Sequence, residues 1–439
     1  MLLEIAMPLK NTAPKGTQAT PEPRPEKIRP GEHLPKENLL EVQDLSVAFK
    51  RKIQNARGQI ITEEARAVDS ISFQLNAGET LCLVGESGCG KSMTSLAVLG
   101  LVPEPGQITE GKVIFMGQDL RALTPRELQK IRGNTLSMIF QEPMTALNPV
   151  LTIGSQIEEV LLTHRKMNRQ EAKEEAVRLL GKVGIPAPWQ RYNDYPHQMS
   201  GGMRQRIVIA MAIANSPKLL IADEPTTALD ATIQRQILDL IKELSTASGT
   251  ATLLITHDLG VVCETADHVV VMYAGRIVEQ GSAEQLFANP LHPYTKGLLA
   301  CSPHLADRQR LPAENNPELF WGNKNRPCTE PCPDSEARHI SSELRTRLAV
   351  IPGTVPSLWQ LPRGCPFNTR CACAFDACFA SLPPLQKIER NISATIAATA
   401  FCLGGKAAVR SEASSCSKPA TRSGGEIAHQ VRCWLYLNK

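Results

Sequence analysis

The 439-residue sequence contains no apolar run that approaches the length of a membrane helix. Its longest apolar stretches, such as "HVVVMYAG" and "LLIADEP", are short, whereas a membrane-spanning helix needs roughly 20 consecutive apolar residues. The first residues also lack the pattern of a secretory signal, because Glu4 interrupts a very short apolar run. We therefore expect a soluble protein that remains inside the cell.

Charge of one sign is not concentrated in any tail or segment. Lys and Arg total 48 and Asp and Glu total 44, which gives a net charge of +4, and no run of five like charges occurs. Basic runs are typical of tails that bind nucleic acid. We therefore expect no nucleic-acid partner.

Cysteine is unevenly distributed. Ten of the 13 cysteines follow residue 300, and four of them fall within residues 364–378. Because thiols are normally reduced inside a cell, this concentration favours metal or redox chemistry over disulfides. The composition also shifts near residue 303, where periodicity fades and Pro, Cys and Asn become more frequent.

These shifts predict three regions along the chain. Residues 1–37 are polar and rich in Pro and Lys, which predicts a disordered arm. Residues 38–303 alternate strand and helix patterns, which predicts an α/β domain with a mostly parallel sheet. Residues 304–439 form a small Cys-rich C-terminal extension with inserted loops at about 306–345 and 380–430.

Within the α/β region, a helical block at 152–215 interrupts the strand pattern and predicts an inserted subdomain. Its clearest helix start is a capping box formed by Asn168 and Glu171. A further helix is expected from Lys91 to Leu101, and a hairpin loop at 50–65. The strands are predicted at 39–49, 67–75, 80–84, 135–140, 219–223, 251–257 and 268–273.

The stretch "GESGCGKS" matches the phosphate-loop pattern G-x-x-x-x-G-K-[ST] at every fixed position. An apolar strand precedes it and a helix follows, as the pattern requires. Its glycines let several backbone N–H groups face one anion, and the helix start adds a positive dipole end. Lys91 is predicted to reach the β- and γ-phosphates, Ser92 to hold Mg²⁺, and Cys89 to be a tolerated small residue. The predicted nucleotide-binding residues are Gly85, Glu86, Ser87, Gly88, Cys89, Gly90, Lys91 and Ser92.

Two carboxylates follow the apolar run "LLIA". Asp223 ends this predicted buried strand, and Glu224 comes directly after it. Behind a phosphate loop, such a pair is suited to hold Mg²⁺ through Asp223 and to polarise an attacking water through Glu224.

The segment "MSGGMRQR" at 199–206 resembles the signature of ABC-type ATPases, and the other motifs stand in that family's order, so the resemblance covers about residues 39–300. The resemblance implies an ABC-type P-loop nucleotide-binding domain. It also makes Gln141 the Q-loop residue, which senses metal and water. Residues 228–230 become the D-loop, with Asp230, and His257 becomes the switch histidine at the γ-phosphate. Met199 departs from the more usual Leu but keeps its bulk.

The family's mechanism pairs two such domains head to tail, with each ATP held between Lys91 of one subunit and Ser200 of the other. Gly201 and Gly202 would complete this second anion site at a helix start. Adenine needs an aromatic face, and Phe49 is the candidate, because residues 50–65 contain no other aromatic.

Three further stretches resemble the ATP-binding subunits of dipeptide, oligopeptide and nickel importers: 138–149, 195–206 and 221–230. The tail at 347–371 and its lead-in at 292–299 resemble the extension of that group. The resemblance implies ATP-driven peptide uptake, including glutathione, at the cytoplasmic face of the membrane. Its partners would be a second ATPase subunit (identical or a sister), two permease subunits and an external solute-binding protein. The alternatives are nickel or another small solute, an exporter subunit, or a soluble ABC ATPase without a transport role.

In relatives of that group, the extension can hold a [4Fe–4S] cluster on four cysteines. Cys365, Cys371 and Cys378 match the first three, and Cys433 resembles the fourth, with Cys402 as a rival and Cys373 as an extra thiol. Structural zinc and plain reduced thiols remain the alternatives.

Overall fold

The computed structural model describes residues 38–54, 58–227, 229–302, 350–388 and 428–436. All of them belong to one compact unit, Lys36–Lys439. The predicted arm 1–37, the insert 306–345 and Cys402 lie outside the described residues. No helix among the residues described is both long and apolar enough to cross a membrane.

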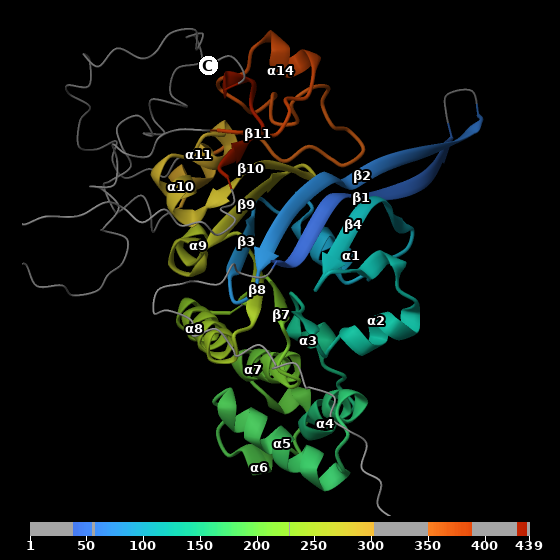
Figure 1. The fold of residues 1–439 in the computed structure, drawn as a ribbon, viewed down its shortest axis with the longest axis vertical. Helices are drawn as coiled ribbons and strands as arrows, with labels where there is room; N and C mark the ends of the chain where they lie inside the picture. Colours follow the sequence, from blue (N-terminus) through green and yellow to red (C-terminus); the bar gives the residue numbers. More distant parts are fainter. Residues whose placement is uncertain (1–37, 55–57, 228, 303–349, 389–427, 437–439) are drawn as a thin grey trace, which may run out of the picture. The chain divides into compact units, whose positions relative to one another are not determined.

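A sheet of eight strands forms the centre of this unit (Figure 1). Five neighbouring strands pair in parallel, in the order β9, β3, β8, β7 and β6, and the other three add antiparallel pairs at one edge. Strands buried on both faces are nearly continuously apolar, as in β7. The bounds are β3 Thr80–Val84, β6 Leu136–Ile139, β7 Leu219–Asp223, β8 Ala251–Thr256, β9 His268–Tyr273, β10 Arg276–Ser282, β11 Gln386–Lys387 and β12 Gln430–Val431.

The two short edge strands β11 and β12 come from the C-terminal extension. Val431 in β12 pairs with Glu279 in β10, and Gln386 in β11 pairs with Val431. His429 adds a hydrogen bond of 2.8 Å from its Nε2 to the fully buried Glu279. The extension therefore continues the central sheet instead of packing as a separate layer.

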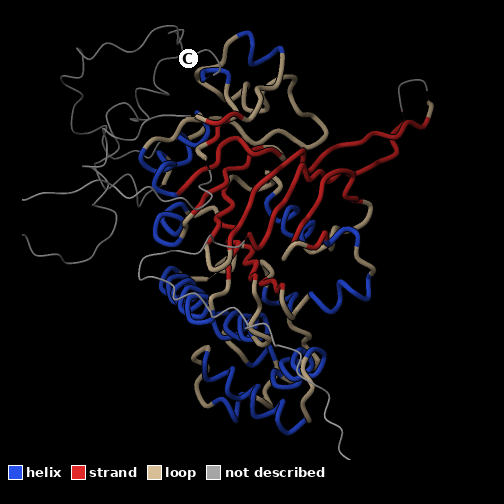
Figure 2. The backbone as a smooth tube through the Cα atoms, viewed as in Figure 1, coloured by secondary structure: helices blue, strands red, loops and turns tan. Residues whose placement is uncertain are grey.

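A second, antiparallel sheet has the order β2-β1-β4-β5. Its strands are β1 Asn38–Gln54, β2 Ile60–Asn76, β4 Gly106–Phe115 and β5 Gln118–Asp119. The predicted loop at 50–65 is therefore wrong, because β1 and β2 continue through most of it as a long hairpin (Figure 2). Opposite charges face each other across this extension, with Lys50 beside Glu64 and Arg51 beside Glu63. Such cross-strand pairs stabilise a ladder that hydrophobic alternation alone does not reveal.

Helices connect the strands and cover the sheet. Five of them, α3 to α7, lie in the sequence between β6 and β7, which are neighbours in the sheet, so this helical region connects two adjacent strands. Helix α1 ends before the predicted Leu101, because Gly100 adopts a left-handed φ of 65°. The bounds are α1 Lys91–Val98, α2 Pro125–Ile131, α3 Pro143–Ala146, α4 Ile153–His164, α5 Arg169–Lys182, α6 Pro188–Arg191, α7 Gly201–Ile213, α8 Ala231–Ser248, α9 Leu259–Thr265, α10 Ala283–Ala288, α11 Pro293–Ala300 and α14 Asp376–Ala380, with short 3-10 turns at Leu120–Ala122, Pro196–Gln198 and Trp434–Tyr436.

Two hydrophobic cores lie on the two faces of the central sheet. Alternate residues of β3 enter different cores: Cys82 packs with the helical region, whereas Leu81 packs with α1 and the antiparallel sheet. Ile351 and Phe367 of the extension join the first of these cores. The extension is therefore held by apolar burial as well as by sheet pairing.

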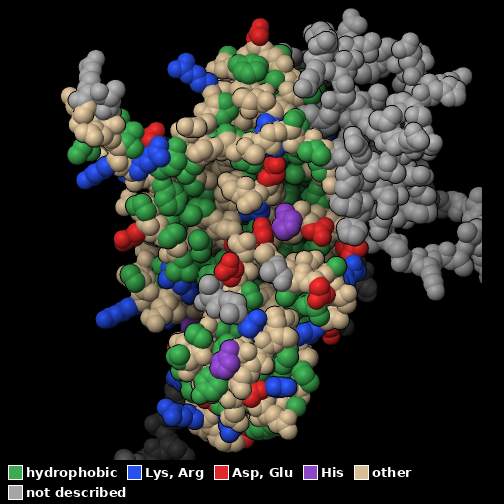
Figure 3. All heavy atoms as spheres, turned by 180° about the vertical axis from the view of Figure 1, so that it is seen from behind, with side chains coloured by type: hydrophobic (Ala, Val, Ile, Leu, Met, Phe, Trp, Pro, Cys, Tyr) green, Lys and Arg blue, Asp and Glu red, His purple; other side chains and the backbone are tan. Residues whose placement is uncertain are grey.

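Surface charge is mixed on the face seen in Figure 3. Lys and Arg side chains are scattered over this face and alternate with acidic ones, and apolar side chains gather below the β1–β2 hairpin.

Candidate nucleotide site

The phosphate-loop motif forms a tight turn between β3 and α1. Gly85 and Gly90 take φ values of 150° and 104°. A Cβ would lie 2.3 Å from Met272 O at Gly85 and 2.6 Å from Ala67 O at Gly90. Only glycine fits this close backbone approach, which explains two of the fixed positions of the motif.

Lys91 is the first residue of helix α1, and its ammonium points back into the phosphate loop. Its Nζ donates to Gly85 O at 2.9 Å and to Glu86 O at 3.1 Å, and it lies 3.9 Å from Cys89 Sγ. Lys91 is only 4% exposed, and Cys89 is fully buried. Burial raises the pKa of the Cys89 thiol, so this small side chain is an uncharged part of the loop wall.

Ser92 and Asp223 meet although 131 residues separate them, with Ser92 Oγ donating to Asp223 Oδ1 at 3.0 Å. Burial raises the pKa of Asp223, the hydrogen bond from Ser92 partly offsets this, and the charge of Glu224 adds to the increase. A hydroxyl beside a buried carboxylate is an oxygen donor set that suits Mg²⁺, and a divalent cation would favour the charged carboxylate. The residues present therefore fit a magnesium ion.

Glu224 follows Asp223, and side chains from the loops after three strands lie at its carboxylate. Its Oε2 accepts hydrogen bonds from Gln141 Nε2 at 3.3 Å and from Thr227 Oγ1 at 3.0 Å. His257 Nδ1 lies 3.6 Å from the same oxygen. Gln141, Glu224 and His257 follow β6, β7 and β8, whose parallel carboxyl ends share one edge of the sheet. This shared edge brings them together.

The backbone at Glu224 is strained. Its φ of 43° is in the left-handed region, which non-glycine residues rarely adopt. Such conformations cost on the order of 1–3 kcal/mol and cluster at functional sites. The strained turn aims a side chain that is 15% exposed toward His257, which is 69% exposed. Thr227, which the sequence did not single out, completes the set.

Family models and curated relatives identify the family of this chain. The family described as "ABC transporter" matches residues 68–227, and the family described as "Oligopeptide/dipeptide transporter, C-terminal region" matches residues 278–329 and 337–378. The "Oligopeptide transport ATP-binding protein OppD" of Bacillus subtilis (strain 168) is 46% identical over 352 residues, which cover 80% of this chain and 86% of that protein. The chain belongs to the ABC transporter ATPases.

A second curated relative supports membership of this family. The "Dipeptide transport ATP-binding protein DppD" of the same strain is 46% identical over 336 residues, covering 76% of this chain and 87% of that protein. A solved structure described as a dimeric post-hydrolysis state of the ATP-binding cassette MJ0796 bound to ADP and Pi aligns at 27% identity with a TM-score of 0.47, over 56% of this chain and 99% of that chain.

In this ABC ATPase, the signature segment begins helix α7. Ser200 is its N-cap and accepts a hydrogen bond from Met203 N at 3.3 Å, and Gly201 and Gly202 form the first turn. A Cβ on Gly202 would lie 3.0 Å from Ile233 Cγ2 in α8. Asp230 caps α8 by accepting from Ile233 N at 3.0 Å. Ser200 and Asp230 thus each stabilise a helix start in this chain, whatever they contact in a second subunit.

Phe49, the candidate for adenine stacking in this ABC ATPase, lies at the outer part of β1 and is half-buried. Its ring packs beside Val102 and Gly106, where a Cβ on Gly106 would lie 2.7 Å from Phe49 Cζ. The ring therefore closes one side of the second hydrophobic core, and its role toward adenine stays a prediction.

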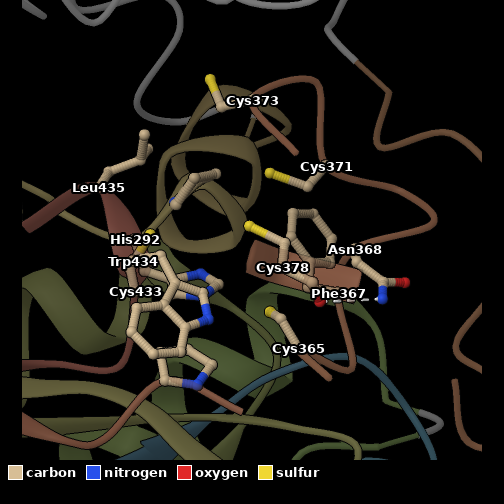
Figure 4. A pocket seen from close by; sticks show the side chains of 12 residues that line it. His292, Cys365, Phe367, Asn368, Cys371, Cys373, Cys378, Cys433, Trp434 and Leu435 are labelled. Atoms are coloured by element: carbon tan, nitrogen blue, oxygen red, sulfur yellow. Dashed lines mark hydrogen bonds between the residues drawn. The ribbon is translucent and has the colours of Figure 1, made fainter. Parts of the chain in front are cut away.

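Five cysteines of the extension surround one pocket of this ABC ATPase (Figure 4). The sulfurs of Cys371 and Cys378 point toward the same side, whereas the sulfur of Cys373 points away from them. Burial raises the pKa of Cys433 to about 12 and also raises the pKa values of Cys365 and Cys371. These thiols are therefore protonated at neutral pH without a cation. The five are Cys365, Cys371, Cys373, Cys378 and Cys433.

Within the described ranges, no group of three or more His, Cys, Asp or Glu side chains is placed to hold a metal ion. None of the described cysteines forms a disulfide. Cysteine thiolates are the ligands of iron–sulfur clusters, so these residues have the donor chemistry of such a cluster.

Proposed function

We propose that this ATPase powers the import of peptides through a membrane permease. The meeting of Ser92 with Asp223 and of Gln141 and His257 with Glu224 carries the ATPase part of the proposal. Two observations support the peptide part: the match of the oligopeptide/dipeptide C-terminal region, and the names of the curated relatives, which are transport proteins for oligopeptides and dipeptides.

Each residue of the nucleotide site has its own role in ATP hydrolysis. Lys91 offers its ammonium to phosphate oxygens that enter the loop, and the N-terminus of α1 adds its dipole. Ser92 and Asp223 would hold Mg²⁺ with Gln141, and the ion would neutralise charge on the transferred phosphoryl group. Glu224 takes the proton of the attacking water, while His257 orients that water and the γ-phosphate.

Two subunits would share each ATP. Ser200, Gly201 and Gly202 of one subunit would contact the γ-phosphate bound at Lys91 of the other, with Asp230 near the same interface. Loss of the γ-phosphate removes a ligand that both subunits hold, so ATP drives a two-state closure and opening. The second subunit is an identical copy or a sister ATPase.

The remaining partners follow from this role. Two permease subunits would hold the ATPase dimer at the cytoplasmic face of the membrane, and an external binding protein would deliver the solute. Residues 38–303 would act as the ATPase domain, with the helical block at 152–215 as its subdomain, and residues 304–439 as the extension.

We also propose a [4Fe–4S] cluster on Cys365, Cys371, Cys378 and Cys433. The lining of one pocket by these four thiols supports it. Anaerobically purified protein should contain about four irons per chain and absorb broadly near 400 nm. Iron-free protein with an unchanged fold would contradict the cluster.

Solute uptake tests the function directly. The ATPase, reconstituted with its permease and binding protein in vesicles, should accumulate labelled di- or oligopeptides only with ATP. The Glu224→Gln variant is the matched control. Uptake of nickel without peptides would replace the proposed solute, and ATP hydrolysis without any partner-dependent uptake would reject the transport role.

A further inference from the structure

A side chain of the C-terminal extension contacts the phosphate-binding loop directly. Arg370 lies between Cys365 and Cys371, and its Nη1 donates to Glu86 Oε2 at 2.7 Å while its Nη2 donates to Glu86 Oε1 at 2.9 Å. The two residues are 284 positions apart in the chain. Two parallel N–H···O bonds between a guanidinium and a carboxylate are the strongest and most directional form of this pair.

Arg370 is held rigidly for this contact. Its Nε donates to Pro352 O at 2.8 Å, and its Nη2 also donates to Gly353 O at 3.2 Å. The guanidinium lies about 6 Å from the rings of Tyr273 and Phe367. Its side chain is only 4% exposed. A planar group with these fixed contacts loses little freedom when it binds a carboxylate.

Glu86 is fixed at its backbone as well. Its N–H donates to Tyr294 Oη at 2.8 Å, and its carbonyl accepts from Lys91 Nζ at 3.1 Å. Glu86 is also an acidic side chain inside a loop built to bind a polyanion. Without a partner, its carboxylate would repel the phosphates of a nucleotide.

We propose that Arg370 is a positioning residue for ATP: it neutralises Glu86 and holds the phosphate loop, so the extension sets nucleotide affinity. The proposal rests on ATP binding at Gly85–Ser92, as in the proposed function, but not on the nature of the solute. It assigns to the extension an effect on the first step of the ATPase cycle.

Nucleotide titration of the full-length chain tests this. A fluorescent ATP analogue gives the dissociation constant with Mg²⁺, and basal hydrolysis gives KM and kcat. Arg370→Met should weaken ATP binding by about tenfold, with kcat at saturating ATP changed less than about twofold, because the loss falls on binding. Arg363→Met is the matched control, since Arg363 is an exposed residue of the same extension, and it should bind ATP normally.

A charge rescue separates positioning from plain misfolding. Glu86→Gln combined with Arg370→Met removes the unpaired carboxylate, so it should recover most of the lost affinity in a double-mutant cycle. The loss in Arg370→Met should also shrink at high salt, which screens the remaining repulsion. Arg370→Lys, which keeps the charge but not the paired bonds, should give an intermediate affinity and serves if Arg370→Met does not fold.

The outcomes are distinct. If Arg370→Met binds ATP as tightly as the wild type, or if the double variant binds as weakly as Arg370→Met, the proposal is overturned. If the wild-type chain itself binds no ATP, the proposed function fails before this inference is reached.

Discussion

At the scale of single residues, three side chains contact the Glu224 carboxylate. Gln141 and Thr227 donate to its Oε2 and His257 lies 3.6 Å from it. The strained φ of 43° at Glu224 is maintained by these contacts and by its backbone N–H, which donates to Ile255 O at 2.9 Å. These contacts fix the orientation of the carboxylate, as the role of general base requires.

Glu224→Gln should retain ATP binding and lower kcat by a factor of about 10²–10⁴, the usual contribution of a general base. The amide keeps the size of the side chain and one acceptor oxygen, but it cannot take a proton from water. Phosphate release, measured at fixed times, gives kcat, and nucleotide titration gives the affinity for ATP. Lys91→Ala provides the contrast, because it should weaken nucleotide binding itself. Normal turnover in Glu224→Gln would remove Glu224 from the role of base.

At the scale of elements, helix starts explain why several polar residues stand where they do. Asn168 accepts from Glu171 N at 2.9 Å, and Glu171 Oε2 accepts from Asn168 N at 2.8 Å, so the predicted capping box of α5 is confirmed. Strand positions in the parallel sheet also match the sequence pattern closely. The loop at 50–65 does not, because the charged pairs that extend β1 and β2 are cross-strand contacts and leave no local signal.

Asn168→Ala should lower the free energy of unfolding by about 1 kcal/mol, as is typical for the loss of an N-cap. ATP turnover should not change, because α5 is outside the nucleotide contacts described above. Chemical denaturation of the purified chain measures the stability. Gln170→Ala, two positions further along the chain and exposed, is the control. An equal loss in both variants would show that the cap is not responsible.

The start of helix α11 makes stability depend on pH. His292 caps this helix, with its Nδ1 accepting from Tyr294 N at 3.1 Å, and it is 1% exposed. Burial lowers the pKa of His292 from 6.5 to about 4, against the opposing charge of Glu279. His292 is therefore protonated near pH 6.5 in the unfolded chain but only near pH 4 in the folded chain. This contribution to stability is complete above pH 6.5 and is lost as the pH falls.

His292→Asn should make the melting temperature less dependent on pH between 7 and 5. Asn retains a capping oxygen but does not titrate. From the pKa difference, the wild type should lose about 2 kcal/mol at pH 5 relative to the variant, at about 1.36 kcal/mol per unit. Thermal melts of both chains across this range give the comparison. Parallel curves for the two proteins would contradict the assignment of a buried neutral imidazole.

At the scale of the whole molecule, one chain provides a phosphate loop and a signature segment that both face nucleotide in the proposed dimer. Ser200 already caps α7 in the single chain, so its role across an interface has to be separated from its role in the helix.

The Glu224→Gln chain should dimerise with ATP and Mg²⁺, because the triphosphate is bound but not cleaved. Size-exclusion chromatography with light scattering measures the mass with ATP and with ADP. Adding Ser200→Asp should abolish the dimer, since Asp is an equally good N-cap but places a negative charge beside the γ-phosphate. An ATP-dependent dimer that survives Ser200→Asp would exclude the signature from the interface.

The sequence by itself determined the chemistry of the nucleotide site and the order of its parts. Motif spacing identified the phosphate loop, the carboxylate pair and the signature, because local backbone geometry dictates which residue types each turn can hold. Buried apolar runs located the parallel strands for the same local reason. Gly85 and Gly90 are clear examples, since only glycine fits between the loop and the backbone at Met272 and Ala67.

Only the tertiary structure decided which distant groups meet. The sheet order brings Gln141 to Glu224 across 83 positions, and the docked extension brings Arg370 to Glu86 across 284 positions. The same is true of Cys433, which joins Cys365 and Cys378 because β12 pairs at the edge of the central sheet. These contacts depend on how whole elements pack and pair, and no short window of sequence contains that information.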